Sequence, residues 1–163
     1  MVINGSGHRP NKLGGYEVDT NERLIALARQ ELIAWQPSRV ISGMALGFDQ
    51  ALTQAAIDLS IPFDAAVPFP GQEQYWPFGA QRYYSDLLKK AATVNIISEA
   101  YSREAMQLRN VWMVDRSNRV LALWNGTPGG TADCLAYARS IGRPITNVWP
   151  KWEGEASLDS MFI

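Results

Sequence analysis

The feature that most constrains the fold is a regular alternation of short apolar runs with longer segments of helical periodicity. The short runs are rich in Val, Ile, Leu and aromatic residues and are bounded by Gly, Pro, Ser or Asn, which is typical of β-strands. Six runs are predicted as strands: Met1–Gly5, Ser38–Ser42, Pro62–Pro68, Thr93–Ser98, Asn118–Trp124 and Pro144–Trp149. Several of them, including residues 94–97 and 120–124, have continuous apolar character, which favours strands covered on both faces and hence a parallel sheet.

Helices are predicted between these strands, in five segments: Asp19–Trp35, Phe48–Leu59, Gly79–Ala92, Tyr101–Asp115 and Thr131–Ile141. The first begins with Asp19 and Glu22 at capping-box spacing, and the last is followed by Gly142, a typical stop signal. Strands that alternate with helices predict the α/β class: a Rossmann-like, doubly wound, mainly parallel sheet with helices on both faces. Residues 1–149 are expected to form this single domain, and the polar segment 150–163 a C-terminal tail.

The charge balance and the cysteine content exclude several classes of protein. The chain of 163 residues carries 15 Lys and Arg against 16 Asp and Glu, a formal net charge of −1. It therefore offers no broad basic field to a nucleic acid. One cysteine, Cys134, and one histidine, His8, exclude an intramolecular disulfide and a histidine-rich metal site. No apolar run approaches the ~20 residues of a membrane helix, and the first residues do not resemble a signal peptide. We expect a cytoplasmic protein without a metal site or a membrane partner.

Glycine-bearing loops follow three of the predicted strands, at residues 5–10, 42–49 and 126–131. In open α/β sheets, ligands bind outside the carboxyl ends of the strands, where the strand order reverses. The last two loops run directly into a helix, whose free N–H groups and dipole favour an anion. The pattern therefore predicts phosphate binding. The spacing matches neither the G-x-G-x-x-G fingerprint nor a Walker A loop, which argues against NAD or ATP bound by those routes.

The residues expected to contact the ligand come from these loops and from two further segments. Arg9 offers its guanidinium to a phosphate or carboxylate, and His8 a hydrogen bond to a base or phosphate. Trp76 offers a ring on which a base can stack. Arg109 also reads as a solvated or ion-paired helical residue. The candidate ligand-binding residues are Ser6, Gly7, His8, Arg9, Ser42, Gly43, Met44, Gly47, Asp49, Gln72, Trp76, Asn110, Gly126, Thr127, Gly129, Gly130 and Thr131.

Five segments carry a resemblance to a known family: Gly7–Pro10 with Leu13-Gly14, Ile41–Asp49, Pro68-Phe69 with Gln72 and Trp76, Arg109–Ser117, and Gly129–Asp133. Together they resemble the SLOG superfamily, a Rossmann-like group that includes the LOG nucleotide phosphoribohydrolases and the DprA DNA-processing proteins, and most closely its YpsA-like branch (DUF1273). The resemblance implies a nucleotide or nucleotide-derived ligand, for example an ADP-ribose-like or cyclic species, and no other cofactor. It also implies a homodimer or larger homo-oligomer, which the abundance of apolar and aromatic residues favours too.

The activity stays open between binding and hydrolysis. LOG enzymes cleave a nucleotide N-glycosidic bond with an Arg and a Glu near a Pro-Gly-Gly-x-Gly-Thr-x-x-Glu loop, whereas this sequence has a shorter loop that ends at Asp133. In the enzyme interpretation, Asp133 stabilises an oxocarbenium-like transition state, and Arg109 or Arg9 holds the phosphate. Asp133 also reads as an ordinary acidic residue in the first turn of a helix.

A third interpretation is DprA-like binding of single-stranded DNA. Its support is a set of four arginines: Arg103, Arg109, Arg116 and Arg119. The near-neutral charge disfavours nucleic acid as a partner.

Overall fold

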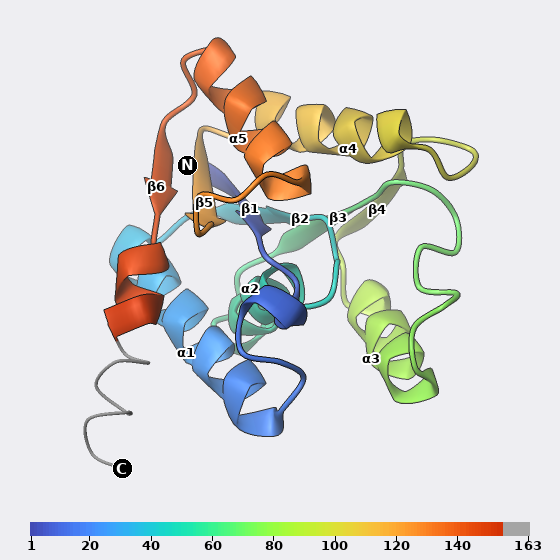
Figure 1. Cartoon of the computed structure of the whole chain (residues 1–163), viewed down its shortest axis with the longest axis horizontal. Helices are drawn as coiled ribbons and strands as arrows, with labels where there is room; N and C mark the ends of the chain where they lie inside the picture. Colours follow the sequence, from blue (N-terminus) through green and yellow to red (C-terminus); the bar gives the residue numbers. More distant parts are fainter. Residues whose placement is uncertain (155–163) are drawn as a thin grey trace.

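The computed structural model describes residues 1–154 and contains a six-stranded sheet in the order β4-β3-β2-β1-β5-β6. Every neighbouring pair of strands is parallel (Figure 1). The strands are β1 (Val2–Gly7), β2 (Arg39–Ser42), β3 (Phe63–Val67), β4 (Thr93–Ile96), β5 (Arg119–Leu123) and β6 (Ile145–Asn147). The helices are the short 3-10 turn η1 (Pro10–Lys12), α1 (Val18–Trp35), α2 (Phe48–Asp58), α3 (Phe78–Lys89), α4 (Arg103–Asp115) and α5 (Gly130–Ser140).

The helices form two layers, one on each face of the sheet. Helices α1, α2 and α3 lie on one face, and α4 and α5 cover the other (Figure 1). The larger core lies under α1 and α2, where Ile3, Phe48 and Leu52 are fully buried. A smaller core under α5 includes Val120 and Leu135. This architecture confirms the predicted Rossmann-like α/β fold. In the part of the chain that the structure describes, no helix combines the length and apolarity needed to cross a membrane.

The strand order reverses beside β1. The chain moves outward from β1 through β2 and β3 to β4, and then returns to place β5 on the other side of β1. Strand β1 extends two residues beyond the predicted end, because Ser6 and Gly7 pair with Ala122 and Leu123 of β5. The carboxyl ends of β1 and β5 therefore mark the switch point at which such sheets bind ligands.

The start of α1 and the end of α5 can be compared with the helix signals predicted from the sequence. Helix α1 begins at Val18 after Glu17, with no side-chain hydrogen bond at its start, so the predicted capping box of Asp19 and Glu22 is wrong. Asp19 instead lies in the first turn, where its negative charge interacts favourably with the helix dipole. The predicted stop of α5 is confirmed, since Gly142 adopts a φ of +71° just beyond the last turn.

The segment that follows β6 packs against the core. Residues 149–154 are helical, and the Trp152 side chain is buried in the core under α1. The Arg23 guanidinium stacks 4.4 Å from the Trp152 ring centroid, and Lys151 pairs with Glu31. The predicted boundary between residues 149 and 150 therefore falls inside a packed helix. The remainder of the expected tail, residues 155–163, lies outside the described residues.

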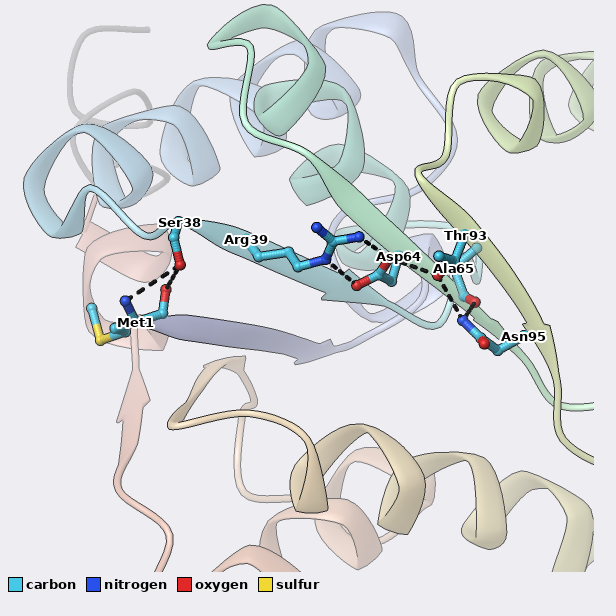
Figure 2. A network of polar contacts seen from close by, with 7 residues as sticks. All are labelled: Met1, Ser38, Arg39, Asp64, Ala65, Thr93 and Asn95. Atoms are coloured by element: carbon cyan, nitrogen blue, oxygen red, sulfur yellow. Dashed lines mark hydrogen bonds and ion pairs between the residues drawn. The ribbon is translucent and has the colours of Figure 1, made fainter.

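Polar contacts join the strands at the β4 side of the sheet (Figure 2). Arg39 of β2 donates two hydrogen bonds to Asp64 of β3, at 2.5 and 2.7 Å. The Thr93 hydroxyl of β4 donates to the same carboxylate at 2.6 Å, and Asn95 donates to Thr93. These bonds, above all that from Arg39, lower the pKa of Asp64. Hydrogen bonds between side chains of β2, β3 and β4 therefore stabilise this part of the sheet.

Candidate functional site

A cavity of about 270 Å³ opens at the carboxyl ends of β1 and β5. Its wall comes from four parts of the fold: β1 and its following turn, the start of α2 with Ala45 of the loop before it, one face of α4, and the loop between β5 and α5. The enclosed volume is close to the lower end, about 300 Å³, of typical ligand pockets. The cavity thus lies at the switch point and suits a small ligand.

Most of the predicted site residues line this cavity, and a second group lies elsewhere. Those that line it are Ser6, Gly7, His8, Arg9, Asp49, Arg109, Asn110, Thr127, Gly129, Gly130 and Thr131. Those that do not are Ser42, Gly43, Met44, Gly47, Gln72, Trp76, Gly126 and Asp133.

Sequence reasoning missed several lining residues, among them Lys12, Ala45, Met106 and Met113. A signal for two of them exists: Met106 and Met113 flank Arg109 and Asn110 at i, i+3, i+4 and i+7 spacing, which places all four on one helix face. Lys12 carries no such signal, because its place depends on the η1 turn.

The loop from β5 to α5 is open and lies beside positive charge. A Cβ atom added at Gly126, Gly129 or Gly130 would meet nothing within 4 Å. Lys12 Nζ donates to Thr127 Oγ1 at 3.0 Å and lies 3.5 Å from the Pro128 carbonyl oxygen. The N-terminus of α5 begins at Gly130, on the wall of the cavity. Lys12, Arg9 and the helix N-terminus therefore form an end of the cavity that attracts an anion.

His8 fixes the start of this loop. Its Nε2 lies 2.9 Å from both the backbone N and the side-chain Oδ1 of Asn125, and its ring packs edge-on against Trp149 with centroids 6.0 Å apart. Burial lowers the pKa of His8 and the charge of Lys12 lowers it further, whereas the side-chain oxygen of Asn125 raises it by accepting from the protonated ring. Through these contacts His8 positions Asn125. No group of three or more His, Cys, Asp or Glu within residues 1–154 could hold a metal ion.

Asn125 carries this order into the glycine loop. Its Oδ1 accepts the Thr127 N–H at 3.0 Å and the Thr127 hydroxyl at 2.6 Å. The loop is therefore anchored at its start, and the glycines that follow remain exposed.

The loop after β2 is buried, and several of its polar groups are bonded within the protein. The Gly43 carbonyl accepts from Arg109 Nη1 at 2.8 Å and from Gln72 Nε2 at 3.2 Å. The Met44 N–H donates to Ser42 Oγ at 3.1 Å. Met44 is completely buried and has a φ of +64°, a conformation that costs a non-glycine residue energy. We call this loop, residues 42–47, the brace, because these contacts pack it against Arg109 and Gln72.

Gln72 and Trp76 support that brace from outside the cavity. Gln72 also donates to the Tyr84 hydroxyl at 3.1 Å. The Trp76 ring packs edge-on against Tyr84, with centroids 5.3 Å apart. The structure therefore places Trp76 against a helix rather than where a base could stack.

Asp49 and Arg109 form the charged centre of the cavity, and only 6% and 5% of these residues is exposed. Burial raises the pKa of Asp49 to about 6, although the charges of Arg109 and Arg9 and the backbone amides of Ala45 and Gly7 pull it down. Arg109 is buried rather than solvated, and it donates to Asn110 Oδ1 at 3.2 Å as well as to Gly43. Asp49 Oδ2 accepts the Ala45 N–H at 3.4 Å, and the Gly7 amide also stabilises the charged carboxylate.

Asp133, the carboxylate considered for catalysis, lies elsewhere. It is exposed in the first turn of α5 and does not line the cavity. Its backbone oxygen accepts from Gln107 at 3.3 Å. The acidic side chain that lines the cavity is Asp49, on α2.

Solved structures share this fold at low sequence identity. Two are DNA processing protein A, from Streptococcus pneumoniae (TM-score 0.62, 15% identity, 88% of this chain) and from Helicobacter pylori (TM-score 0.64, 16% identity, 89% of this chain), the second studied for its single-stranded DNA binding mode. This chain spans 48% and 63% of those two structures. The molybdenum cofactor carrier protein of Chlamydomonas reinhardtii is also similar (TM-score 0.56, 17% identity, 98% of this chain and 84% of that one).

Sequence comparison identifies the family. The uncharacterized SPbeta prophage-derived protein YoqJ of Bacillus subtilis (strain 168) is 26% identical over 156 residues, which cover 84% of this chain and 91% of YoqJ. Residues 4–139, which include all four parts of the cavity wall, match the family YpsA, described as the YspA SLOG family. The chain therefore belongs to the YspA SLOG family, as the resemblance of its five segments predicted.

Proposed function

We propose that this protein binds a nucleotide or nucleotide-derived ligand in the cavity at the carboxyl ends of β1 and β5. The observation that carries the proposal is the exposed glycine loop, residues 126–130, which leads into the N-terminus of α5 beside Lys12 and Arg9. A phosphate at this end would accept hydrogen bonds from backbone N–H groups. The helix dipole and two cationic side chains would attract its negative charge.

Binding is favoured over hydrolysis by the placement of the acidic residues. An N-glycosidase needs a carboxylate beside the anomeric carbon of the bound sugar. Asp133 is exposed outside the cavity, and Asp49 is held between Arg109 and the backbone of the brace. Among the proteins of similar fold, one is named as a cofactor carrier, which is a binding function.

A test of the proposal uses calorimetry with the four ribonucleoside 5′-monophosphates and with inorganic phosphate. The variant Gly130→Val adds a branched side chain at the α5 N-terminus, where the phosphate would rest. The matched control is Gly79→Val, because Gly79 also lies in the first turn of an exposed helix, α3, with nothing within 4 Å of an added Cβ. We expect Gly130→Val to weaken binding at least ~10-fold and Gly79→Val to leave it unchanged, with both circular dichroism spectra native.

Three outcomes would contradict the proposal. Equal affinity of the two variants would show that the phosphate does not bind at the N-terminus of α5. Wild-type protein that binds none of these ligands, and that carries no nucleotide by native mass spectrometry after purification from cells, would remove the small-ligand function. Tight binding of single-stranded oligonucleotides, with a steep loss of affinity on added salt, would favour the DNA interpretation instead. Release of free base would show the enzyme.

Homodimer formation stays a prediction, with one supporting observation. Val94 and Ile96 of the edge strand β4 are exposed, as are apolar side chains in the segments before and after it in the sequence, namely Tyr75, Phe78, Tyr101 and Leu108. Light scattering at micromolar concentration tests it, and a strict monomer mass would count against it.

A further inference from the structure

Asn147, which does not line the cavity, binds the backbone at the point where β5 ends. Its Nδ2 donates to the Trp124 carbonyl oxygen at 2.9 Å, and its Oδ1 accepts the Trp124 N–H at 3.1 Å. The same Oδ1 accepts the Trp149 N–H at 3.1 Å. Trp124 is the first residue after β5, and Asn147 is the last residue of β6, the edge strand beside it (Figure 1). The Asn147 amide therefore continues the contact between the two strands beyond their last paired residues.

Trp124 connects this amide to the glycine loop. Its indole Nε1 donates to the Thr127 carbonyl oxygen at 2.7 Å. That oxygen lies in the planar peptide that joins Thr127 to Pro128, and the proline ring restricts the next φ angle. The indole bond therefore sets the direction in which the chain enters Gly129 and the N-terminus of α5.

The same C-terminal segment supports the loop along a second route. The Trp149 ring packs edge-on against His8, whose Nε2 contacts Asn125. Asn125 Oδ1 in turn accepts the N–H and the hydroxyl of Thr127. With the Trp124 indole on its carbonyl oxygen, every polar group of Thr127 has a partner, and both sets of contacts lead back to residues 147–149.

The part of the loop that faces the ligand has no packing of its own. Gly129 and Gly130 are exposed, and a Cβ added at either would meet nothing within 4 Å. Glycine has more backbone freedom to lose than any other residue, so the order of this segment depends on the residues that precede it. A loop already held in its binding conformation costs less to order when a ligand binds. Contacts at residues 124–127 therefore affect ligand affinity.

We infer that Asn147 is a positioning residue of the anion-binding end: it orients Trp124, whose indole holds Thr127 so that the free N–H groups at the start of α5 face the phosphate. The inference rests on the proposed function and adds to the same site a residue that does not touch the ligand.

The test measures by calorimetry how inorganic phosphate and adenosine 5′-monophosphate bind to Asn147→Leu, which keeps a branched side chain and removes all three hydrogen bonds. We expect affinity for both to fall about 5- to 10-fold, because the loop must then be ordered on binding. The matched control is Asn118→Leu. Asn118 is also exposed and binds backbone beside β5, but at the opposite end of the strand, where its Oδ1 accepts the Val2 N–H at 2.7 Å. Its affinity should stay within about 2-fold of wild type, since it leaves the loop untouched.

A spectroscopic measurement separates positioning from a general loss of structure. The indole N–H of Trp124 is followed in ¹H–¹⁵N spectra and assigned with Trp124→Phe. In Asn147→Leu this resonance should move, because the bond to Thr127 changes, whereas that of Trp152, buried in the core under α1, should not. Asn118→Leu should move neither.

The outcomes separate this inference from the proposed function. Wild-type affinity in a folded Asn147→Leu overturns the role of Asn147 and leaves phosphate binding at α5 intact. An equal loss in Asn118→Leu also overturns it, because the effect would then arise from stability alone. If Asn147→Leu does not fold, Trp124→Phe decides: it removes the indole donor, and unchanged affinity overturns the inference. Absence of any phosphate or nucleotide binding by wild-type protein overturns the proposed function and the inference with it.

Discussion

The loops after β2 and after β5 follow the same sequence pattern, but the first is closely packed and the second is open. Each contains glycines, follows a buried strand and leads into a helix. In the first, an added Cβ at Gly43 would lie 2.5 Å from Arg109 Nη1, and one at Gly47 would lie 2.6 Å from the His8 carbonyl oxygen. In the second, an added Cβ at Gly126 or Gly130 meets nothing within 4 Å.

The difference shows that glycine has a separate structural role in each loop. After β2, the missing side chain lets the buried Arg109 and the turn after β1 approach the backbone closely. After β5, it keeps the backbone exposed, so that N–H groups remain available to a ligand. The same glycine-rich strand-to-helix pattern therefore gives a closely packed turn after β2 and an exposed turn after β5.

The largest effect that would break the brace is loss of Arg109. Replacement by Met keeps much of the side-chain volume and removes the bonds to Gly43 and Ala66 while leaving Asp49 beside an apolar group. Leaving buried acceptors without their charged donor costs about 1–3 kcal/mol. We expect urea denaturation of Arg109→Met to show a loss of that size. The control is Arg103→Met on the exposed first turn of the same helix, which should change stability by less than ~0.5 kcal/mol.

The second effect compares a glycine from each loop directly. Gly47 and Gly126 have nearly the same φ, +94° and +90°, so alanine is strained at both by about 1–2 kcal/mol. Only at Gly47 does the new Cβ also meet a backbone atom, the His8 carbonyl oxygen. Forcing extra volume into a packed site adds about 1–3 kcal/mol. Gly47→Ala should therefore be the more destabilising variant in urea, and equal losses would show that the brace is not tightly packed.

The sequence could predict the fold because each element carries its own local signal. The continuous apolar runs at residues 94–97 and 120–124 indicated parallel strands, and Gly142 marked the end of α5. The prediction that both strands are covered on both faces holds for β5 but is wrong for β4, because β4 is an edge strand and its Val94 and Ile96 are exposed. The site was harder to predict, since the function of a turn depends on what packs against it. Nothing in the local sequence at Gly43 says that Arg109, 66 residues away, donates to its carbonyl.

Two residues show the same limit from the other side. Asp133 follows the glycine loop at a spacing that suggested a role at the sugar, but its side chain is exposed in the first turn of α5 and does not line the cavity. Asp49 looked like one polar residue of a loop. Its importance as a buried carboxylate between Arg109 and the Ala45 amide appears only when three segments meet.

The smallest effect concerns pH and tests whether the brace buries a charge. The Asp49 carboxyl has a pKa of about 6 in the folded protein and about 4 when unfolded. Its contribution to stability is therefore fully present below about pH 4 and is lost as the pH rises through 6, because the folded protein gives up its proton at the higher pH. The difference in free energy of unfolding, wild type minus Asp49→Asn, should fall by about 1 kcal/mol between about pH 5 and about pH 7.5. Taking the difference removes the opposite effect of His8, whose pKa is lowered by burial and whose contribution to the free energy of unfolding falls as the pH falls.

Asp58→Asn is the control, since the pKa of Asp58 is lowered and its carboxyl stays ionised across this range in both states. Parallel stability curves for wild type and Asp49→Asn would show that the Asp49 carboxylate is solvated, and the contrast between the two loops would then lose its electrostatic part.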